Sequence, residues 1–266
     1  MTAVYADLVR YRELFGSLFR RDLQAKYKGS VFGLAWSLAN PVVQMAVYAL
    51  VFSVLWQITD ESISPYPLFL LSGLLVWVFF AGSLQSASRS MVENANLIRK
   101  TRFPRQLLPL SSLGTQLVAF VVMLAVLVPL EFVLRPETRD TVWLAIPLSL
   151  LVVALVAGLA LAVASLNAIY RDVEHLVSAL LLPWFFLTPV LYTSESLPAE
   201  GWEGLVDVLH WVNFVSPAVT AVRDPLFFGR LPDPLDVVYL AASAVVALAL
   251  GAWIFRRVDD RIAVEL

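Results

Sequence analysis

The chain has 266 residues, of which 59% are hydrophobic and only 15% are charged, and its formal net charge is −2. About a quarter of the residues are charged in a soluble domain of average composition, so these values are typical of a membrane protein. Cysteine is absent, which excludes disulfides and thiolate metal sites. With His175 and His210 as the only histidines, we expect no metal centre.

The first 30 residues predict an amphipathic helix followed by a basic linker. Apolar side chains recur at helical spacing over residues 4–19, at Val4, Leu8, Tyr11, Leu14, Phe15, Leu18 and Phe19. The opposite face carries Arg10, Glu13, Ser17 and Arg20, and the linker adds Arg21, Lys26 and Lys28. A helix with one apolar face lies in the membrane interface rather than across the bilayer. Residues 1–30 are therefore expected to lie at the membrane surface.

Residues 31–266 predict a single all-α integral membrane domain with six transmembrane helices. A helix needs about 20 apolar residues to cross the hydrocarbon layer. Stretches of this kind lie at about 35–57, 68–87, 109–132, 143–168, 176–192 and 236–255. Between the fifth and sixth spans, about 198–217, the apolar runs are too short to cross and predict re-entrant or interfacial helices.

Basic residues gather on one side of the predicted membrane. They precede the first span, separate the second from the third, and follow the last; Arg171 lies between the fourth and fifth. Only Arg135, Arg139, Arg223 and Arg230 fall on the other side, which is rich in acidic residues. Because cytoplasmic loops are enriched in Lys and Arg, both termini are expected in the cytoplasm.

The predicted spans almost lack ionisable groups. Glu131 and Arg171 come nearest, and we interpret both as anchors at span ends. An ion-coupled carrier normally keeps an ionisable group near the membrane midplane. The sequence also lacks a nucleophile–base pair and a phosphate-binding loop of the form GxxxxGK[ST]. We expect no catalytic residues and no cofactor bound by this chain, so uphill transport would take its energy from another protein.

Two cytoplasmic segments combine cations with other features. Residues 21–30 lead into Trp36 and Asn40-Pro41. On its own, this stretch is explained as well by a positive-inside anchor followed by a helix kink at Pro41 as by a functional role. Residues 93–105 place the apolar Leu97, Ile98 and Phe103 among cations. A topology signal needs charge alone, so these apolar side chains indicate docking onto a protein surface.

These segments form part of a longer series, which also includes Asn167 to Asp172, Trp184, Thr188-Pro189-Val190, Tyr192, Asn213 and Ser216-Pro217. In order and spacing, the series resembles the membrane subunits of type-II (ABC-2-type) ABC exporters, specifically the polysaccharide branch that exports O-antigen and teichoic acid polymers. The resemblance covers nearly the whole chain.

The resemblance implies a permease subunit of the bacterial inner membrane that pairs with a second copy of itself. Two copies of a separate ATPase subunit, which binds ATP and Mg, would dock beneath it. The implied substrate is a lipid-linked polysaccharide of the cell envelope, such as the O-antigen of lipopolysaccharide. Membrane lipids are expected partners and nucleic acid is not.

The resemblance also assigns roles to residues. The interface helix would use Leu8, Tyr11, Phe15, Leu18, Phe19, Arg20 and Arg21. The coupling helix that contacts the ATPase would use Glu93, Asn96, Leu97, Ile98, Arg99, Lys100 and Phe103. The exit gate would include Trp202, Trp211, Asn213, Phe214 and Pro217. The segment from Asn167 to Asp172 either forms a local cap with an Arg–Asp pair or contacts the ATPase or the lipid carrier.

A polymer cannot be held in one pocket and needs a continuous path, along which aromatic rings stack on sugar CH faces. Candidate rings are Tyr48, Trp56, Trp77, Phe79, Phe80, Trp184, Phe185 and Phe186. Any one of them taken alone is better explained as facing lipid or belonging to the interfacial aromatic belt. In the same way, the small residues Ala154, Gly158 and Ala162 favour ordinary helix packing over a dimer contact.

Two other functions stay open from the sequence. Related permeases export drugs or other small hydrophobic molecules, which would change drug tolerance without trapping glycan inside the cell. An ion-coupled carrier or a membrane scaffold belongs to a different class, and the absence of midplane charges argues against the carrier.

Overall fold

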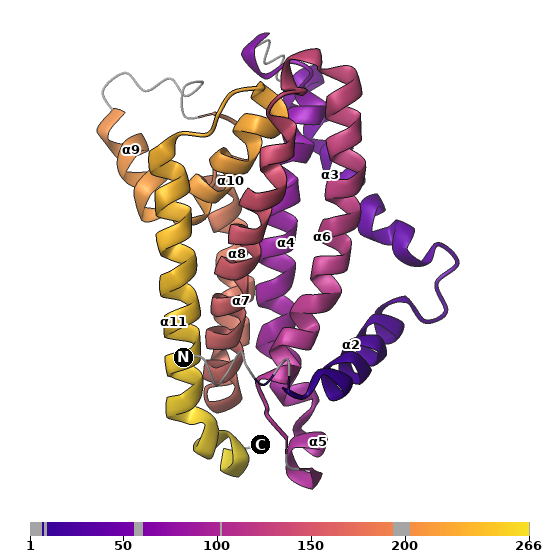
Figure 1. The fold of residues 1–266 in the computed structure, drawn as a ribbon, viewed down its shortest axis with the longest axis vertical. Helices are drawn as coiled ribbons and strands as arrows, with labels where there is room; N and C mark the ends of the chain where they lie inside the picture. The colour runs from indigo at the N-terminus through magenta and orange to yellow at the C-terminus, as the bar shows by residue number, and fades with distance from the viewer. Residues whose placement is uncertain (1–6, 8–9, 56–60, 102, 194–202, 266) are drawn as a thin grey trace.

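The computed structural model describes residues 7, 10–55, 61–101, 103–193 and 203–265 (Figure 1). Within these residues the chain is helical and contains no strand, which confirms the predicted all-α class. Its helices are α2 (Arg12–Tyr27), α3 (Trp36–Ala49), α4 (Tyr66–Glu93), α5 (Ala95–Lys100), α6 (Leu107–Leu134), α7 (Ala145–Ile169), α8 (Asp172–Leu187), α9 (Glu203–Val212), α10 (Val215–Arg223) and α11 (Pro234–Glu265). Short 3-10 or π turns are Gly33–Ala35, Leu50–Leu55, Glu61–Ile63, Pro136–Thr138, Val142–Leu144 and Asp224–Phe228.

Among the described residues, four helical segments are long and apolar enough to cross a membrane. They are Tyr66–Glu93, Leu107–Leu134, Val142–Ile169 and Pro234–Asp259. These segments coincide with the second, third, fourth and sixth predicted spans and extend beyond them at both ends. Hydropathy alone places the C-terminal end of α4 too early, because polar residues such as Gln85 and Ser86 continue the helix after its apolar run has finished.

The first and fifth predicted spans correspond to shorter helices. The apolar part of α3 covers Leu38–Phe52, contains Pro41 and is followed by a π turn. Helix α8 has 16 residues, and its first turn carries Asp172 and Glu174. Sixteen residues give a length of about 24 Å, less than the roughly 30 Å of the hydrocarbon core. By length and hydropathy, the structure supports four of the six predicted spans.

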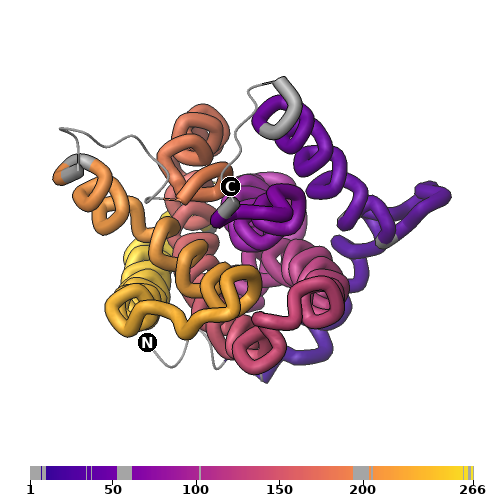
Figure 2. The backbone as a smooth tube through the Cα atoms, turned by 90° about the horizontal axis from the view of Figure 1, so that it is seen from above, coloured from indigo at the N-terminus to yellow at the C-terminus, as the bar shows by residue number. Residues whose placement is uncertain are grey.

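Helix α4 is the central element of the bundle. Of its most apolar window, 72% is buried, against 28% for the corresponding windows of α6 and α11. It packs against α3, α6, α7, α8 and α10, and Figure 2 shows it among the other helices when the bundle is seen from above. Most of the surface of α4 therefore meets protein, whereas Gln85, Arg89 and Glu93 near its C-terminal end are exposed.

Helices α7 and α11 pack through glycine. A Cβ atom on Gly158 would lie 2.2 Å from the carbonyl carbon of Ala247, and one on Gly251 would lie 2.2 Å from the carbonyl oxygen of Gly158. Small residues let two helix backbones approach closely. Gly158 therefore serves packing between two helices of the same chain, in line with the sequence-based interpretation.

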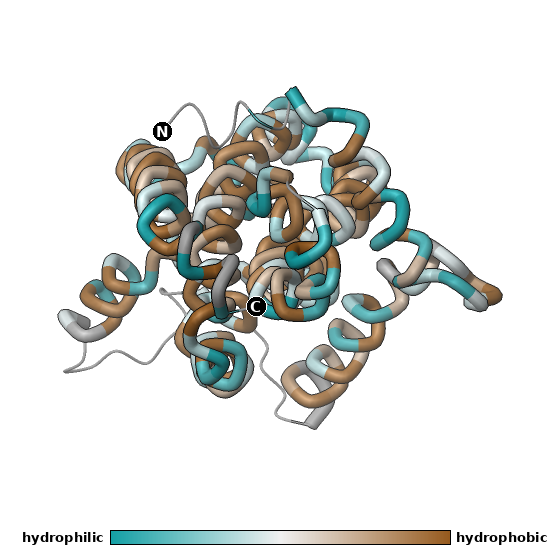
Figure 3. Tube along the Cα trace, turned by 90° about the horizontal axis from the view of Figure 1, so that it is seen from below, coloured by the Kyte–Doolittle hydropathy of each residue, from teal (hydrophilic) through white to brown (hydrophobic). Residues whose placement is uncertain are grey.

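The functional segments separate to the two ends of the bundle. Helix α5, the lower part of α2 and the C-terminal end of α11 lie at one end, whereas α9 and α10 lie at the other (Figure 1). Viewed from below, hydrophilic stretches alternate with hydrophobic ones at the first of these ends (Figure 3). The predicted coupling and exit regions are thus on opposite sides of the molecule.

The N-terminal amphipathic helix ends later than residue 19, where the periodicity placed its end. Helix α2 runs to Tyr27, so much of the predicted basic linker is helical. Leu23, Gln24, Ala25 and Lys26 are all strong helix formers. Gly29 then takes a positive φ of 78°, a conformation that glycine adopts without strain and that ends the helix. Val4 and Leu8 lie outside the described residues.

Candidate functional site

Helix α5 lies directly beyond the end of α4 and is anchored by its apolar side. Ile98 is only 7% exposed and packs in a cluster with Met91 and Leu108. Leu97 and Phe103 pack against the same cluster and are half-buried. The sequence suggested that these three residues dock onto a partner; in the structure Ile98 faces the interior of its own chain. The exposed side chains here are Glu93, Asn96, Arg99 and Lys100.

The apolar face of α2 joins the same cluster as α5. Leu18 is 5% exposed, and Tyr11 and Phe15 pack around it. The Phe19 ring stacks on that of Phe15 at a centroid distance of 6.5 Å. Arg20 and Arg21 are exposed on the other side. One hydrophobic cluster therefore holds α2, α5 and the end of α11 together.

Polar contacts hold the same end of the bundle together. Arg105, in the loop after α5, forms an ion pair with Asp259 of α11, with 2.8 Å between Nη1 and Oδ1. The Asn167 amide donates to the carbonyl of Ser88 at 2.8 Å and accepts from the backbone N–H of Glu174 at 2.9 Å. Asn167 thus forms the predicted cap and ties α7 to α4 and α8. The ion pair at this corner joins Arg89 to Glu174 rather than Arg171 to Asp172.

Six of the eight candidate rings contact one another. Centroid distances are 5.4 Å for Trp77–Phe185, 5.6 Å for Trp77–Phe80, 5.5 Å for Tyr48–Phe185, 5.1 Å for Phe80–Trp184 and 5.3 Å for Phe185–Phe186. The rings come from α3, α4 and α8. Phe186 is 53% exposed, whereas Phe80 is almost fully buried. These six rings, called the aromatic wall below, pack together within one chain, and Phe186 is exposed at its edge.

Of the two remaining candidate rings, Phe79 packs elsewhere and Trp56 is not described. Phe79 points to the other side of α4 and packs on Phe120, with ring centroids 4.6 Å apart. Trp56 lies outside the described residues, as does Trp202 of the predicted exit region. Trp211, also of the exit region, packs on Tyr239 of α11 at 5.4 Å.

Asn213 joins the end of α8 to the start of α10. Its Oδ1 accepts from the indole N–H of Trp184 at 2.7 Å, and its Nδ2 donates to the Thr188 hydroxyl at 2.9 Å. Phe214 then packs edge-on against Trp184, with centroids 5.2 Å apart, and Pro217 is buried in α10. Residues that the sequence assigned to separate channel and exit groups therefore form one unit.

Arg223, at the C-terminal end of α10, is the residue that sequence reasoning missed. It is 2% exposed and donates to the backbone carbonyls of Pro189 and Val190, the latter at 2.9 Å. Its guanidinium also lies 4.1 Å above the ring of Phe69. A Cβ on Gly73 would lie 1.9 Å from its Nη2 atom, so glycine makes the space for this side chain.

The comparison with known families decides the identity of this arrangement. The family described as ABC-2 type transporter matches residues 13–227. The chain belongs to this family. The match runs from α2 through Arg223 and covers α5, the aromatic wall and the α8–α10 junction.

Relatives of this ABC-2 permease cover almost its full length. The O-antigen export system permease protein RfbA of Myxococcus xanthus is 33% identical over 255 residues, 96% of each chain. A protein of the same name from Klebsiella pneumoniae is 29% identical over 257 residues, 94% of each chain. The polysialic acid transport protein KpsM of Escherichia coli is 22% identical over 250 residues, 92% of this chain and 93% of the relative. The resemblance predicted from the sequence is confirmed, including its polysaccharide branch.

Proposed function

We propose that this ABC-2 permease is the membrane subunit of an ABC exporter that moves a lipid-linked cell-envelope polysaccharide from the cytoplasm across the inner membrane. The observation that carries this proposal is the end-to-end similarity to permeases named for the export of O-antigen and polysialic acid. A shared fold would not specify the cargo, but a match over more than nine tenths of both chains includes the elements that surround the path.

The proposed topology keeps six spans, with α3 and α8 as the two shorter ones and α9 and α10 re-entrant. Val43 and Val47 on α3 and Leu180 and Leu182 on α8 are more than half exposed in the single chain. Lipid or a second copy of the permease must cover such apolar faces. The end that carries α5 would face the cytoplasm, as the basic residues predicted. Residues 31–266 would then form one transmembrane domain.

The proposed path for the polymer follows the aromatic wall. Tyr48 and Trp184 are half-buried and Phe186 is exposed, so the edge of the wall is accessible from one side. A second copy of the chain would close this side and enclose the channel. The α8–α10 junction at Asn213 would then form the exit, where the wall meets the re-entrant helices.

The proposed partner is an ATPase subunit, present in two copies, that binds ATP and Mg and docks on α5. The exposed Arg99 and Lys100 provide a cationic surface, while Ile98 holds the helix against the bundle. Because one cluster also includes α2 and α11, closure of the ATPase pair would move these elements together. ATP hydrolysis on the partner is the energy source in this proposal.

Charge reversal on α5 tests the coupling surface. We expect Arg99→Glu with Lys100→Glu to reduce recovery of the ATPase with the purified permease, and glycan export, by about ten-fold or more, because like charges set against each other cost several kcal/mol. Arg139→Glu, an exposed cation at the opposite end of the bundle, is the matched control. Full ATPase recovery and normal export by the double variant would contradict the docking proposal.

Deletion of the permease tests the cargo. A polysaccharide exporter predicts that lipid-linked glycan accumulates inside the deleted cells and that surface glycan is lost. Fractionated cells analysed for lipid-linked glycan by mass spectrometry give the answer. Normal surface glycan together with altered drug tolerance would overturn the proposed cargo.

A further inference from the structure

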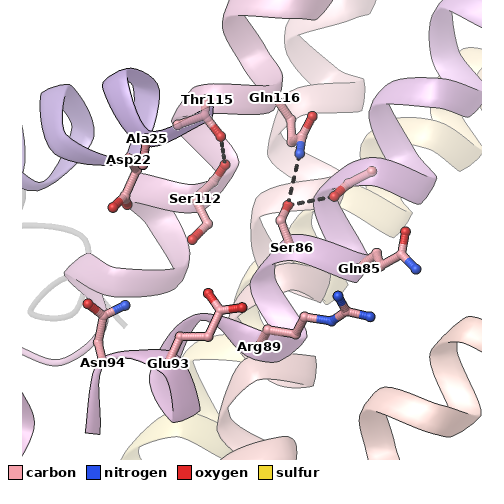
Figure 4. A pocket seen from close by; sticks show the side chains of 11 residues that line it. Asp22, Ala25, Gln85, Ser86, Arg89, Glu93, Asn94, Ser112, Thr115 and Gln116 are labelled. Carbon is pink, nitrogen blue, oxygen red and sulfur yellow. Dashed lines mark hydrogen bonds between the residues drawn. The ribbon is translucent and has the colours of Figure 1, made fainter. Parts of the chain in front are cut away.

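A polar cavity lies between α2, α4 and α6, near the end of the bundle that carries α5. Its volume is about 440 Å³, within the roughly 300–1,000 Å³ of small-molecule sites. The main polar groups of its wall are Asp22 of α2, Ser86, Arg89 and Glu93 of α4, and Ser112 and Gln116 of α6. Asp22, Ser112 and Glu93 surround a common space, with Arg89 along one edge (Figure 4).

The walls of the cavity are held in place by their own hydrogen bonds. Lys26 Nζ donates to Gln116 Oε1 at 2.9 Å, Gln116 Nε2 donates to Ser86 Oγ at 3.2 Å, and Ser111 Oγ donates to Asp22 Oδ2 at 2.6 Å. These bonds join α2 to α6 and α6 to α4. A preformed space lined by a few convergent polar groups is typical of a ligand site, and here those groups suit a ligand that offers hydrogen bonds.

The polar groups of the lining indicate the class of ligand. Asp22 and Glu93 contribute carboxylates, but Asp22 is paired with Arg21 at 2.8 Å, just as the Arg89 guanidinium is paired with Glu174 at 2.8 Å. Because these charges are largely paired within the protein, the lining offers mainly hydrogen-bonding groups. Amides and hydroxyls donate to and accept from hydroxyl groups, and carboxylates accept from them. This composition fits a group with several neighbouring hydroxyls.

We propose that this cavity binds a polyol group at the membrane surface. Two sources offer this chemistry: a sugar residue of the transported glycan, or the glycerol headgroup of phosphatidylglycerol. Assignment to the glycan rests on the proposed function, whereas assignment to the lipid does not. Under the proposed topology the site faces the cytoplasmic leaflet, beside the coupling helix.

The test fills the cavity and measures both ligands on the full-length permease in lipid nanodiscs. Ala25→Leu and Ser112→Leu place a larger side chain in the cavity from α2 and from α6, respectively. Gln24→Leu adds the same side chain at the neighbouring, exposed position of α2 outside the cavity and is the control. The first probe is the cells' own glycan, which is freed from its lipid by mild acid and titrated into phosphatidylcholine nanodiscs that contain the permease. The second probe is phosphatidylglycerol, and native mass spectrometry counts the molecules that the protein retains.

We expect either filling variant to reduce the affinity or retention of one of the two probes by at least about ten-fold, because several hydrogen bonds of about 0.5–1.5 kcal/mol each are lost. Gln24→Leu should leave the binding of both probes unchanged. Which probe responds identifies the source. If Ser112→Leu does not fold, Ala25→Leu, on the exposed side of α2, decides alone. Equal binding by all variants, or no binding of either probe, overturns the site even if the cells export glycan normally. Retained phosphatidylglycerol binding in a permease that exports no glycan would overturn the proposed function and leave the site standing.

Discussion

Arg223→Met should destabilise the permease by about 3–5 kcal/mol, because it leaves buried acceptors without donors. Methionine retains much of the side-chain volume but cannot donate to the carbonyls of Pro189 and Val190 or to Ser72, all of which Arg223 contacts. Each buried acceptor left unsatisfied costs about 1–3 kcal/mol. Unfolding of the purified permease, followed by tryptophan fluorescence against denaturant, measures the change in the free energy of unfolding.

Arg223→Lys separates the role of charge from that of geometry. A lysine ammonium cannot contact two carbonyls and cover the Phe69 ring together as the guanidinium does, so we expect only partial rescue. Arg256→Met, at an exposed position of α11, should change the free energy of unfolding by no more than about 0.5 kcal/mol. A similarly small effect of Arg223→Met would show that the turn after α8 is held by other contacts.

Gly158→Leu should separate α7 from α11 and cost about 3 kcal/mol or more. Even the first carbon of the side chain would lie 2.2 Å from the backbone of Ala247, and a clash with backbone is not relieved by rotating a side chain. Overpacking of this kind costs about 1–3 kcal/mol and sometimes more, and here it acts on the helix pair with the most extensive contact in the chain. The same denaturant titration detects it.

Two further glycine variants calibrate that result. Gly251→Ala, at the other side of the same crossing, should also destabilise, since its Cβ would lie 2.2 Å from the Gly158 oxygen. Gly16→Ala in α2 meets nothing within 4 Å and should be neutral or stabilising by about 0.5–1 kcal/mol. If Gly158→Leu were as stable as Gly16→Ala, the result would contradict the close approach of the α7 and α11 backbones at Gly158.

Local patterns predicted much of the fold. Continuous apolar runs located the four long helices, and a 3.6-residue period identified the apolar face of α2, where Leu18 is indeed buried. Hydropathy gave poorer bounds, because helices continue through polar residues such as Gln85 and through good helix formers such as Ala25. Helix α3 ends where a π turn begins at Leu50, and α8 ends at the turn that starts at Thr188, and an apolar count registers neither change.

The site was less accessible to sequence reasoning because its contacts join distant residues. Arg223 meets Ser72 across 151 positions, and in the sequence it was only one of the cations used to assign topology. Ile98 looked like a docking residue because it stands among cations, yet it packs on Met91 and Leu108 of its own chain. The family motif at Asn213 and Thr188 was found as a pattern, and only the structure supplies the hydrogen bond that explains it.

Reconstitution into liposomes tests most directly whether this permease depends on a separate ATPase subunit for directional transport. The permease alone and the permease with the proposed ATPase subunit are each supplied with lipid-linked glycan and ATP, and transported glycan is measured by its accessibility to an added glycosidase. The account predicts ATP-dependent transport only when both proteins are present. Directional transport by the permease alone would contradict it.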